Sequence, residues 1–231
     1  MKATATTALV VCLAACNSTW TVTPTPGANG FDAAQGQDWR FASTGGEGPS
    51  ATWQAHADQG AVSAPNVMSM VAPNHRSEDR FNLCWSATPK FVDGRLSLAV
   101  RADRGEIDRG GGPMWRVQDD DNYYVCRWNP LEHNFRVYVV RRGVRFQLAT
   151  AIVSAAPAAW HRIEVEHQGA RIRCWLDGEK LLEANDATIP GAGGVGLWTK
   201  ADACTSFDDL VVRPGASSAA VPQNTGPGGG N

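Results

Sequence analysis

The sequence has little excess of charge of either sign. Among its 231 residues, 21 lysines and arginines are balanced by 23 aspartates and glutamates, which gives a formal net charge of -2. Proteins that hold nucleic acid neutralise phosphates with clustered basic residues, and this chain has no such block. We therefore expect no nucleic-acid partner.

Long hydrophobic runs are also missing. The first apolar stretch, Ala3 to Ala15, follows Met1-Lys2 and is too short to span a bilayer. It ends in Leu13-Ala14-Ala15-Cys16, which resembles the bacterial lipobox, a signal whose cysteine is lipidated and becomes the new N-terminus. We expect residues 1–15 to be a lipoprotein signal peptide, with Cys16 tethering an exported protein to the membrane of the bacterial cell envelope. The alternative is a plain secretory signal with a chance cysteine.

Several familiar chemical motifs are absent. There is no CxxC pair and no GxSxG, HExxH or phosphate-cradling loop, so zinc sites, thiol redox pairs and several hydrolase mechanisms lack support. We expect no cofactor, with calcium as the one candidate metal. An oxidising compartment would permit three pairings among the four remaining cysteines, and buried free thiols are the alternative. These cysteines are Cys84, Cys126, Cys174 and Cys204.

Almost no segment shows helical periodicity. Short alternating runs are separated instead by turn residues such as Gly143, Gly169 and Asp177-Gly178, a pattern typical of antiparallel β-sandwiches. We expect an all-β domain at 31–213, preceded by a lipid anchor and flexible spacer at 16–30 and followed by a disordered low-complexity tail at 214–231. The candidate strands are 51–57, 66–72, 80–86, 94–102, 113–118, 123–128, 135–142, 144–153, 161–168, 171–177, 179–184, 194–200 and 206–212.

The C-terminal half carries a family resemblance. WHRIEVEHQGARIRCWLDGEKLLEANDATIPGAGGVGLWTKADACTSFDDLVV resembles the second half of concanavalin A-like jelly-roll domains, and RVQDDDNYYVCRW resembles a hairpin that recurs in them. That group includes laminin G-like modules, family 16 glucanases and the 3-keto-disaccharide hydrolase-type domains of bacterial exported proteins. The resemblance covers about Gly94 to Val212 and implies a jelly-roll β-sandwich of two antiparallel sheets. It indicates function only weakly, because this fold hosts lectins, hydrolases, lyases and adhesive modules.

Strand alternation divides the central strands into two faces. The apolar set gives a core face that includes Trp115, Tyr124, Trp128 and Val137. Cys126 and Cys174 would point inward on it from opposite sheets, so a bridge between them is one candidate. The other set interleaves arginines with aromatic rings, which suit the hydroxyls and apolar faces of sugars. We expect it to be an exposed sheet face that binds a glycan, and an ordinary solvated face is the alternative. Its members are Arg116, Gln118, Tyr123, Arg127, Arg136, Tyr138, Trp198 and Lys200.

Three stretches could carry further chemistry. Asp119-Asp120-Asp121-Asn122 could offer oxygen atoms to calcium, but a hairpin turn explains it better. Glu106-Ile107-Asp108 resembles the start of the catalytic strand of family 16 glucanases, although Gly110 and Gly111 stand where the second glutamate belongs. His75 lies in a polar loop near Cys84, and it is the candidate catalytic base if the protein is an enzyme.

The function we expect from these residues is carbohydrate binding or surface interaction by an envelope lipoprotein. The second hypothesis is a glycoside hydrolase or lyase of the 3-keto-disaccharide hydrolase type, which would use His75. The third is a purely structural envelope lipoprotein.

Overall fold

The computed structural model describes Phe31, residues 38–73 and residues 77–215. Within these residues the chain forms β-strands and no helix, so no described helix is long and apolar enough to cross a membrane. His75, Cys16, the expected signal peptide and spacer, and residues 216–231 of the expected tail lie outside the described residues. The strands are β1 (Trp39–Thr44), β2 (Thr52–Ala57), β3 (Asn66–Ala72), β4 (Phe81–Phe91), β5 (Gly94–Arg104), β6 (Gly111–Asp119), β7 (Asn122–Asn129), β8 (Asn134–Arg141), β9 (Val144–Ile152), β10 (Trp160–Gln168), β11 (Arg171–Leu176), β12 (Glu179–Asn185), β13 (Gly193–Lys200) and β14 (Cys204–Pro214).

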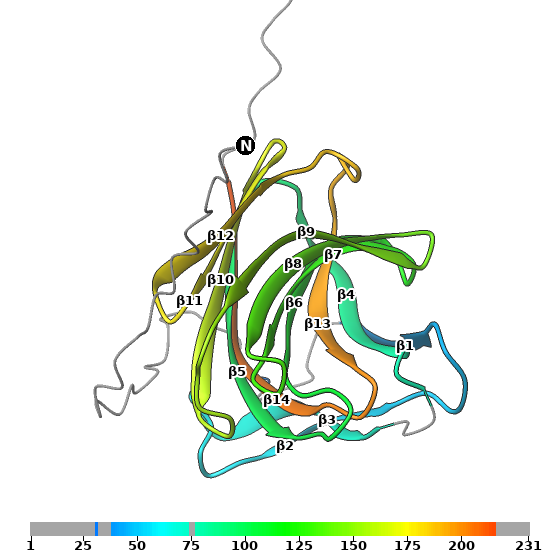
Figure 1. Cartoon of the computed structure of the whole chain (residues 1–231), viewed down its shortest axis with the longest axis vertical. Helices are drawn as coiled ribbons and strands as arrows, with labels where there is room; N and C mark the ends of the chain where they lie inside the picture. Colours follow the sequence, from blue (N-terminus) through cyan, green and yellow to red (C-terminus); the bar gives the residue numbers. More distant parts are fainter. Residues whose placement is uncertain (1–30, 32–37, 74–76, 216–231) are drawn as a thin grey trace, which may run out of the picture.

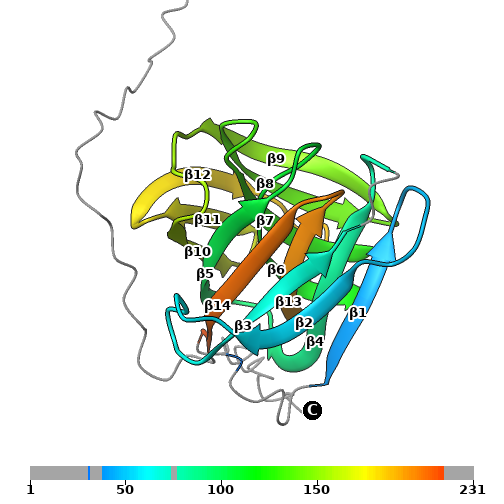
Figure 2. The ribbon, with the colours of Figure 1, turned by 90° about the horizontal axis from the view of Figure 1, so that it is seen from below.

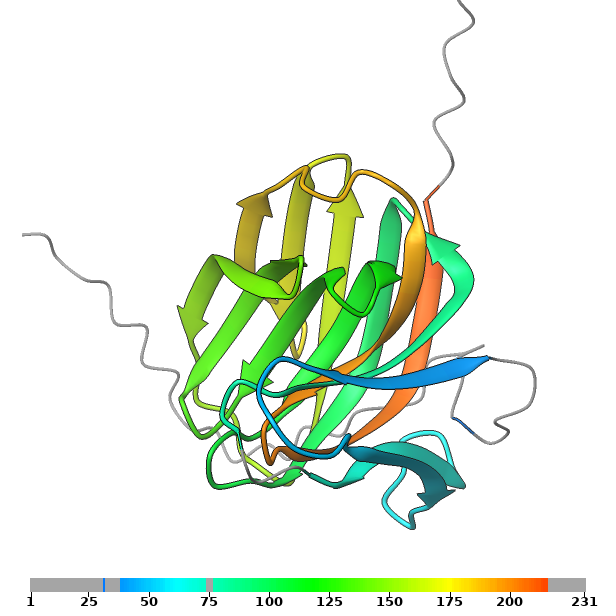
Figure 3. The same cartoon turned by 90° about the vertical axis from the view of Figure 1, so that its right-hand side faces the viewer.

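The strands form two antiparallel sheets that pack face to face (Figure 1, Figure 3). We call the sheet with the order β1-β4-β13-β6-β7-β8-β9 the front sheet and the sheet with the order β12-β11-β10-β5-β14-β3-β2 the back sheet. Figure 2 shows β2 and β3 beside β14 at one side of the back sheet. The all-β sandwich of two antiparallel sheets expected from the sequence is confirmed.

The turns follow from the residues that the sequence provides. Arg142 and Gly143 have φ values of 51° and 73°, and Asp177 and Gly178 have 51° and 80°. Two consecutive positive φ values are typical of the tight hairpin turns whose twist matches that of the flanking strands.

All thirteen expected strands are present. The additional strand is β1, whose WRFAST sequence has no clear alternation of buried and exposed residues.

The main core lies between the two sheets. Trp115, Tyr124 and Trp128 of the front sheet fill it, as expected, together with Ile163 and Phe207 of the back sheet. The four cysteines beyond Cys16 are buried there as free thiols. Cys126 and Cys174 do point inward from opposite sheets, and burial next to Cys174 raises the pKa of the Cys126 thiol.

The front sheet is strongly curled. The guanidinium carbon of Arg145 in β9 lies 5.2 Å from the ring centroid of Phe81 in β4, although five strand spacings separate these strands. In a flat sheet those spacings would put roughly 24 Å between them. The face away from the main core is therefore concave, as the curve from β9 to β4 in Figure 1 shows.

Candidate functional site on the concave face

The structure places six of the eight predicted ligand residues on the concave face of the front sheet. They share the face with a second apolar cluster that includes Phe81, Leu83 and Val125. Backbone pairing sets Arg127 directly opposite Arg136, and Tyr138 opposite Val125. The six are Tyr123 and Arg127 in β7, Arg136 and Tyr138 in β8, and Trp198 and Lys200 in β13.

The expectation that this face is open to solvent is wrong for four of the six. Tyr123 and Trp198 have no exposed surface, Arg127 is 1% exposed and Tyr138 is 3% exposed. The curl of the sheet packs these side chains against one another: the Trp198 indole donates a 3.1 Å hydrogen bond to the Tyr123 hydroxyl, and Arg145 covers the Trp198 and Tyr138 rings. Only Arg136 and Lys200 keep partly exposed side chains.

Arg116 does not lie on the concave face, because a β-bulge interrupts β6. Its φ is 48°, and the pairing register with β7 shifts between Trp115 and Asp119, so Val117 takes the concave side instead. Arg116 is buried and donates to the backbone carbonyls of Val92, Ile189 and Gly169 at 2.7, 2.8 and 2.9 Å. It therefore ties together loops at one end of the sandwich.

Gln118 follows the bulge and also leaves the predicted face. Its side-chain amide donates to the carbonyls of Arg116 and Ala192 at 3.1 and 3.2 Å. It lines a shallow cleft of about 360 Å³ together with Arg141, Arg142 and the loop before β13. This cleft lies at the end of β7 opposite the polar cluster described next.

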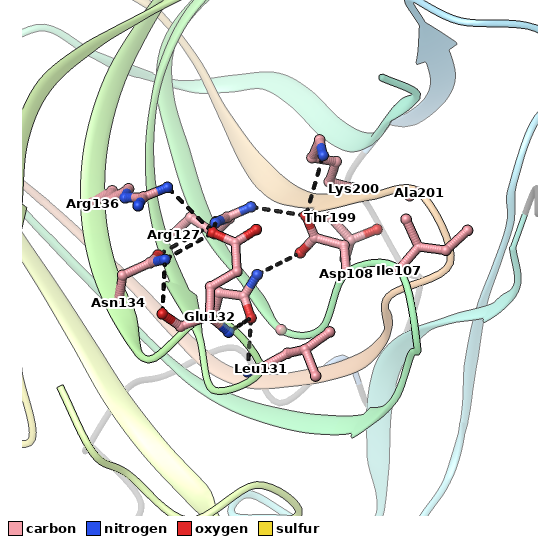
Figure 4. Close-up of polar contacts among 12 residues, drawn as sticks. Ile107, Asp108, Arg127, Leu131, Glu132, Asn134, Arg136, Thr199, Lys200 and Ala201 are labelled. Atoms are coloured by element: carbon pink, nitrogen blue, oxygen red, sulfur yellow. Dashed lines mark hydrogen bonds and ion pairs between the residues drawn. The ribbon is translucent and has the colours of Figure 1, made fainter. Parts of the chain in front are cut away.

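A polar cluster occupies the other end of the concave face, with Arg127 at its centre (Figure 4). The two terminal nitrogens of Arg127 donate to separate carboxylates, Asp108 Oδ2 and Glu132 Oε2, each at 2.8 Å. Arg136 Nη1 lies 3.2 Å from the same Glu132 oxygen, and Lys200 Nζ lies 3.5 Å from Asp108. Hydrogen bonds to charged groups at these distances fix the side chains in one arrangement.

Asp108 is the buried anion of this polar cluster. It has no exposed surface, and its Oδ1 accepts a 2.9 Å hydrogen bond from the Asn129 amide. Burial raises the pKa of Asp108, while Arg127 and Lys200 partly offset this shift. The loop that carries Asp108 is held by Asp202, whose carboxylate accepts from the backbone N–H of residues 106 to 108 at 2.7 to 3.1 Å.

Glu132 is the accessible anion, with 38% of its side chain exposed. Partial burial alone would raise its pKa, but hydrogen bonds from Asn134 and Arg127 outweigh burial and hold the pKa below its ordinary value. The β7–β8 loop presents Glu132 because Asn129 Oδ1 accepts from the backbone N–H of Leu131 and Glu132 at 2.9 and 3.0 Å. Exposed Leu131 and Ile107 lie beside the cluster (Figure 4).

The two carboxylates do not form an accessible acid–base pair. Opposite pKa shifts on Asp108 and Glu132 are a pattern found in glycosidases, where both carboxyl groups flank the bond that is cleaved. Here Asp108 is enclosed, and its oxygens already accept from Arg127 and Asn129. Its segment is a loop between β5 and β6, so the strand expected from the glucanase pattern is not formed.

Two other candidate chemistries also lack support. Burial in the core raises the pKa of the Cys84 thiol well above its ordinary value, which disfavours a nucleophilic thiolate. On the back sheet, His56 Nε2 contacts Ser69 Oγ at 3.0 Å, and Ser69 contacts Ser206, which donates to Asp103. Ser69 is buried between these two partners, so its hydroxyl is not accessible to a substrate as a nucleophile.

The aspartate-rich segment is a hairpin turn, as predicted. Asp119 Oδ1 accepts from the Asp121 backbone N–H at 2.9 Å and from the Asn122 amide at 2.8 Å. Asp120 instead accepts from the Trp85 indole at 2.7 Å, which joins the turn to β4. Among the residues described, no group of three or more His, Cys, Asp or Glu side chains has the arrangement of a metal site.

Solved structures place this geometry in a known fold. The carbohydrate-binding module CBM66 from Bacillus subtilis matches with a TM-score of 0.60 at 15% identity, covering 75% of this chain and 94% of that one. A β-glucanase from Bacillus licheniformis matches with a TM-score of 0.54 at 12% identity, covering 83% of this chain and 97% of that one. The chain has a concanavalin A-like jelly-roll fold.

Other comparisons agree on the jelly roll and go no further. The cellulose-induced protein Cip1 matches with a TM-score of 0.52 at 16% identity, covering 75% of this chain and 89% of that one. No family model and no curated protein matches the sequence. The jelly roll is shared by binding modules and hydrolases, so the function has to be argued from the site.

Sequence reasoning did not place three residues on the concave face: Glu132 and Arg145 were not singled out, and Asp108 was considered only as part of a glucanase-like pattern. For Arg145 a signal existed, because the Arg142-Gly143 turn pairs it with Val140, which alternation along β8 puts on the same side as Tyr138 and Arg136. Asp108 and Glu132 lie in loops, where alternation says nothing about direction. Their position depends on hydrogen bonds that their backbone N–H groups donate to the side chains of Asp202 and Asn129, and these contacts exist only in the folded chain.

Proposed function

We propose that this protein is a carbohydrate-binding module whose ligand lies on the polar cluster around Arg127 on the concave face. The observation that carries the proposal is that accessible Glu132, Arg136 and Lys200 are held by buried Arg127 and Asp108, with exposed Leu131 and Ile107 beside them. Charged hydrogen-bonding groups next to apolar side chains match sugars, which have hydroxyl edges and apolar ring faces.

The rigidity of the cluster supports binding. Arg127 is fixed by two carboxylates, and Glu132 in turn accepts from Arg127, Asn134 and Arg136. Side chains that are already ordered lose little conformational entropy when a ligand arrives. A sugar can therefore be held without a deep pocket.

Binding is favoured over a hydrolase or lyase reaction because the polar cluster has one accessible carboxylate. A glycosidase of the usual kind needs two that reach the substrate, and Asp108 is enclosed. The second function, a hydrolase or lyase of the 3-keto-disaccharide hydrolase type, would need a base outside the described residues, for which His75 stays the candidate.

A glycan array probed with the full chain tests the proposal. We expect binding to a subset of glycans, and at least tenfold weaker binding in Arg136→Ala and Lys200→Ala. The matched control is Arg171→Ala, an arginine that pairs with Glu183 on the back sheet and should bind like the native chain. An array without any bound glycan would overturn the proposal, and release of a sugar product during the assay would favour the hydrolase.

We also propose that Cys16 anchors the module to the envelope membrane, with the lipobox-like segment as the supporting observation. Expression in a bacterial host with a radiolabelled fatty acid tests this. Label should enter the native chain and be absent from Cys16→Ser, and an unlabelled native chain would contradict the anchor.

A further inference from the structure

Arg145 is a cationic side chain on the concave face that lacks an acidic partner. Its guanidinium carbon lies 4.5 Å from the ring centroid of Tyr138 and 5.7 Å from that of Trp198. No described residue accepts a hydrogen bond from it, and its Nη1 is buried without a partner. The residue as a whole is partly exposed.

Two more unused donors lie on the same concave face as Arg145. The Tyr138 hydroxyl and the Arg127 Nε are also buried without a hydrogen-bond partner, on the two strands that precede β9 in the sheet. Buried donors are normally satisfied, so those that find no acceptor within the chain are open to an acceptor supplied from outside it. All of these donors require an acceptor.

The charge around them favours a negatively charged acceptor. The polar cluster and Arg145 together contain four cationic side chains and two anionic ones, Asp108 and Glu132. Both carboxylates already bind Arg127. The cationic set is Arg127, Arg136, Arg145 and Lys200. Burial lowers the pKa of Arg145, nearby Arg127 acts in the same direction, and Asp108 opposes them. The cationic side chains outnumber the two carboxylates, so an anion placed there would be attracted.

We propose that Arg145 and Tyr138 recognise a carboxylate on the ligand, so the module prefers acidic glycans built from uronic acid residues. A planar carboxylate matches the two-pronged edge of a guanidinium, and a tyrosine hydroxyl can donate to the same group. This inference rests on the glycan-binding function proposed above and specifies its ligand class.

Paired polymers test the inference with the full chain. Polygalacturonate and its fully methyl-esterified form share one backbone and differ in the free carboxylate, and dextran sulfate supplies negative charge without carboxylates. We expect the native chain to bind polygalacturonate at least tenfold more tightly than the ester or dextran sulfate. Arg145→Gln should bring the acid-to-ester affinity ratio close to one, and Arg145→Lys should recover only part of it.

The control variant is Arg40→Gln, since Arg40 also stacks on an aromatic ring, Trp85 at 5.0 Å, and should keep the native ratio. Thermal unfolding of each variant shows whether the fold persists, and Tyr138→Phe provides a second variant that removes only the hydroxyl.

Equal affinity for acid and ester would overturn the acidic preference, as would a native ratio in both Arg145→Gln and Tyr138→Phe. Equally tight binding of dextran sulfate would overturn carboxylate recognition. Binding to neutral glycans with no acidic preference leaves the carbohydrate-binding proposal standing, whereas no binding to any glycan ends both.

Discussion

The indole N–H of Trp115 donates a 2.9 Å hydrogen bond to Nδ1 of His167, and this contact joins the two sheets inside the core. Because Nδ1 accepts, the imidazole is neutral and carries its proton on Nε2. Burial, together with the positive charge of Arg116, lowers the pKa of His167 to about 4.

Acid should therefore destabilise the protein through His167. The unfolded chain takes up this proton near pH 6.5 and the folded chain only near pH 4, so stability falls as the pH drops between these values, by about 3 kcal/mol. Urea unfolding at pH 7 and pH 4.5 measures the loss. His167→Gln, which can still accept from Trp115, should show a smaller loss, and an equal loss in both proteins would contradict the assignment.

His161 should behave in the opposite direction. Its two ring nitrogens contact oxygen acceptors, Asp177 Oδ2 at 2.6 Å and the Ala156 carbonyl at 2.9 Å, so the doubly protonated ring fits the site. Burial alone would lower its pKa, but Asp177 raises it above 6.5 overall. The stabilisation is complete below pH 6.5 and is lost as the pH rises through the folded pKa. An NMR titration should find that raised value, and Asp177→Asn should lower it.

Removing the cation at the centre of the polar cluster should be costly. Arg127→Met leaves Asp108 buried without its main partner, which we expect to lower the free energy of unfolding by about 3–5 kcal/mol. Arg95→Ala breaks an exposed pair with Glu166 and should change it by less than about 1 kcal/mol. Denaturant unfolding compares them. Adding Asp108→Leu to Arg127→Met should recover part of the loss, and no recovery would argue against an uncompensated charge.

The loop that presents Asp108 should depend on Asp202. This carboxylate accepts three consecutive backbone N–H groups, whereas the amide of Asp202→Asn offers a single oxygen acceptor. We expect faster hydrogen exchange at residues 106 to 108 and weaker glycan binding, while amides of the β10–β11 hairpin stay as protected as in the native chain. Unchanged exchange at 106 to 108 would show that the loop is held by other contacts.

The fold was largely predictable because its determinants are local. Alternation along YYVCRW and FRVYVV placed Tyr124, Trp128 and Val137 in the main core, and Asp177-Gly178 formed the expected turn. The bulge at Arg116 was not predictable from alternation, which assumes an unbroken strand. Its one sequence signal is Gly193 on the neighbouring strand, where a side chain would meet the Arg116 backbone at 2.4 Å.

The exposure of the site could not be predicted, because it depends on curvature. Alternation correctly put Tyr138 and Trp198 on the face opposite the main core, but it carries no information about what lies across that face. Arg145 covers both rings only because the sheet curls through five strand spacings. Long-range shape of this kind results from the twist and pairing of all the strands together.

The contact between Arg145 and Phe81 also has a dynamic consequence. β9 is the outermost strand of its sheet, and an outermost strand normally detaches before its neighbours. Here Arg145 of β9 contacts Phe81 of β4, a strand near the opposite edge of the sheet. Detachment of β9 therefore also exposes the aromatic rings of β4, β8 and β13 that Arg145 covers. Edge strand β9 and the inner strands of this sheet should therefore unfold together, as one cooperative unit.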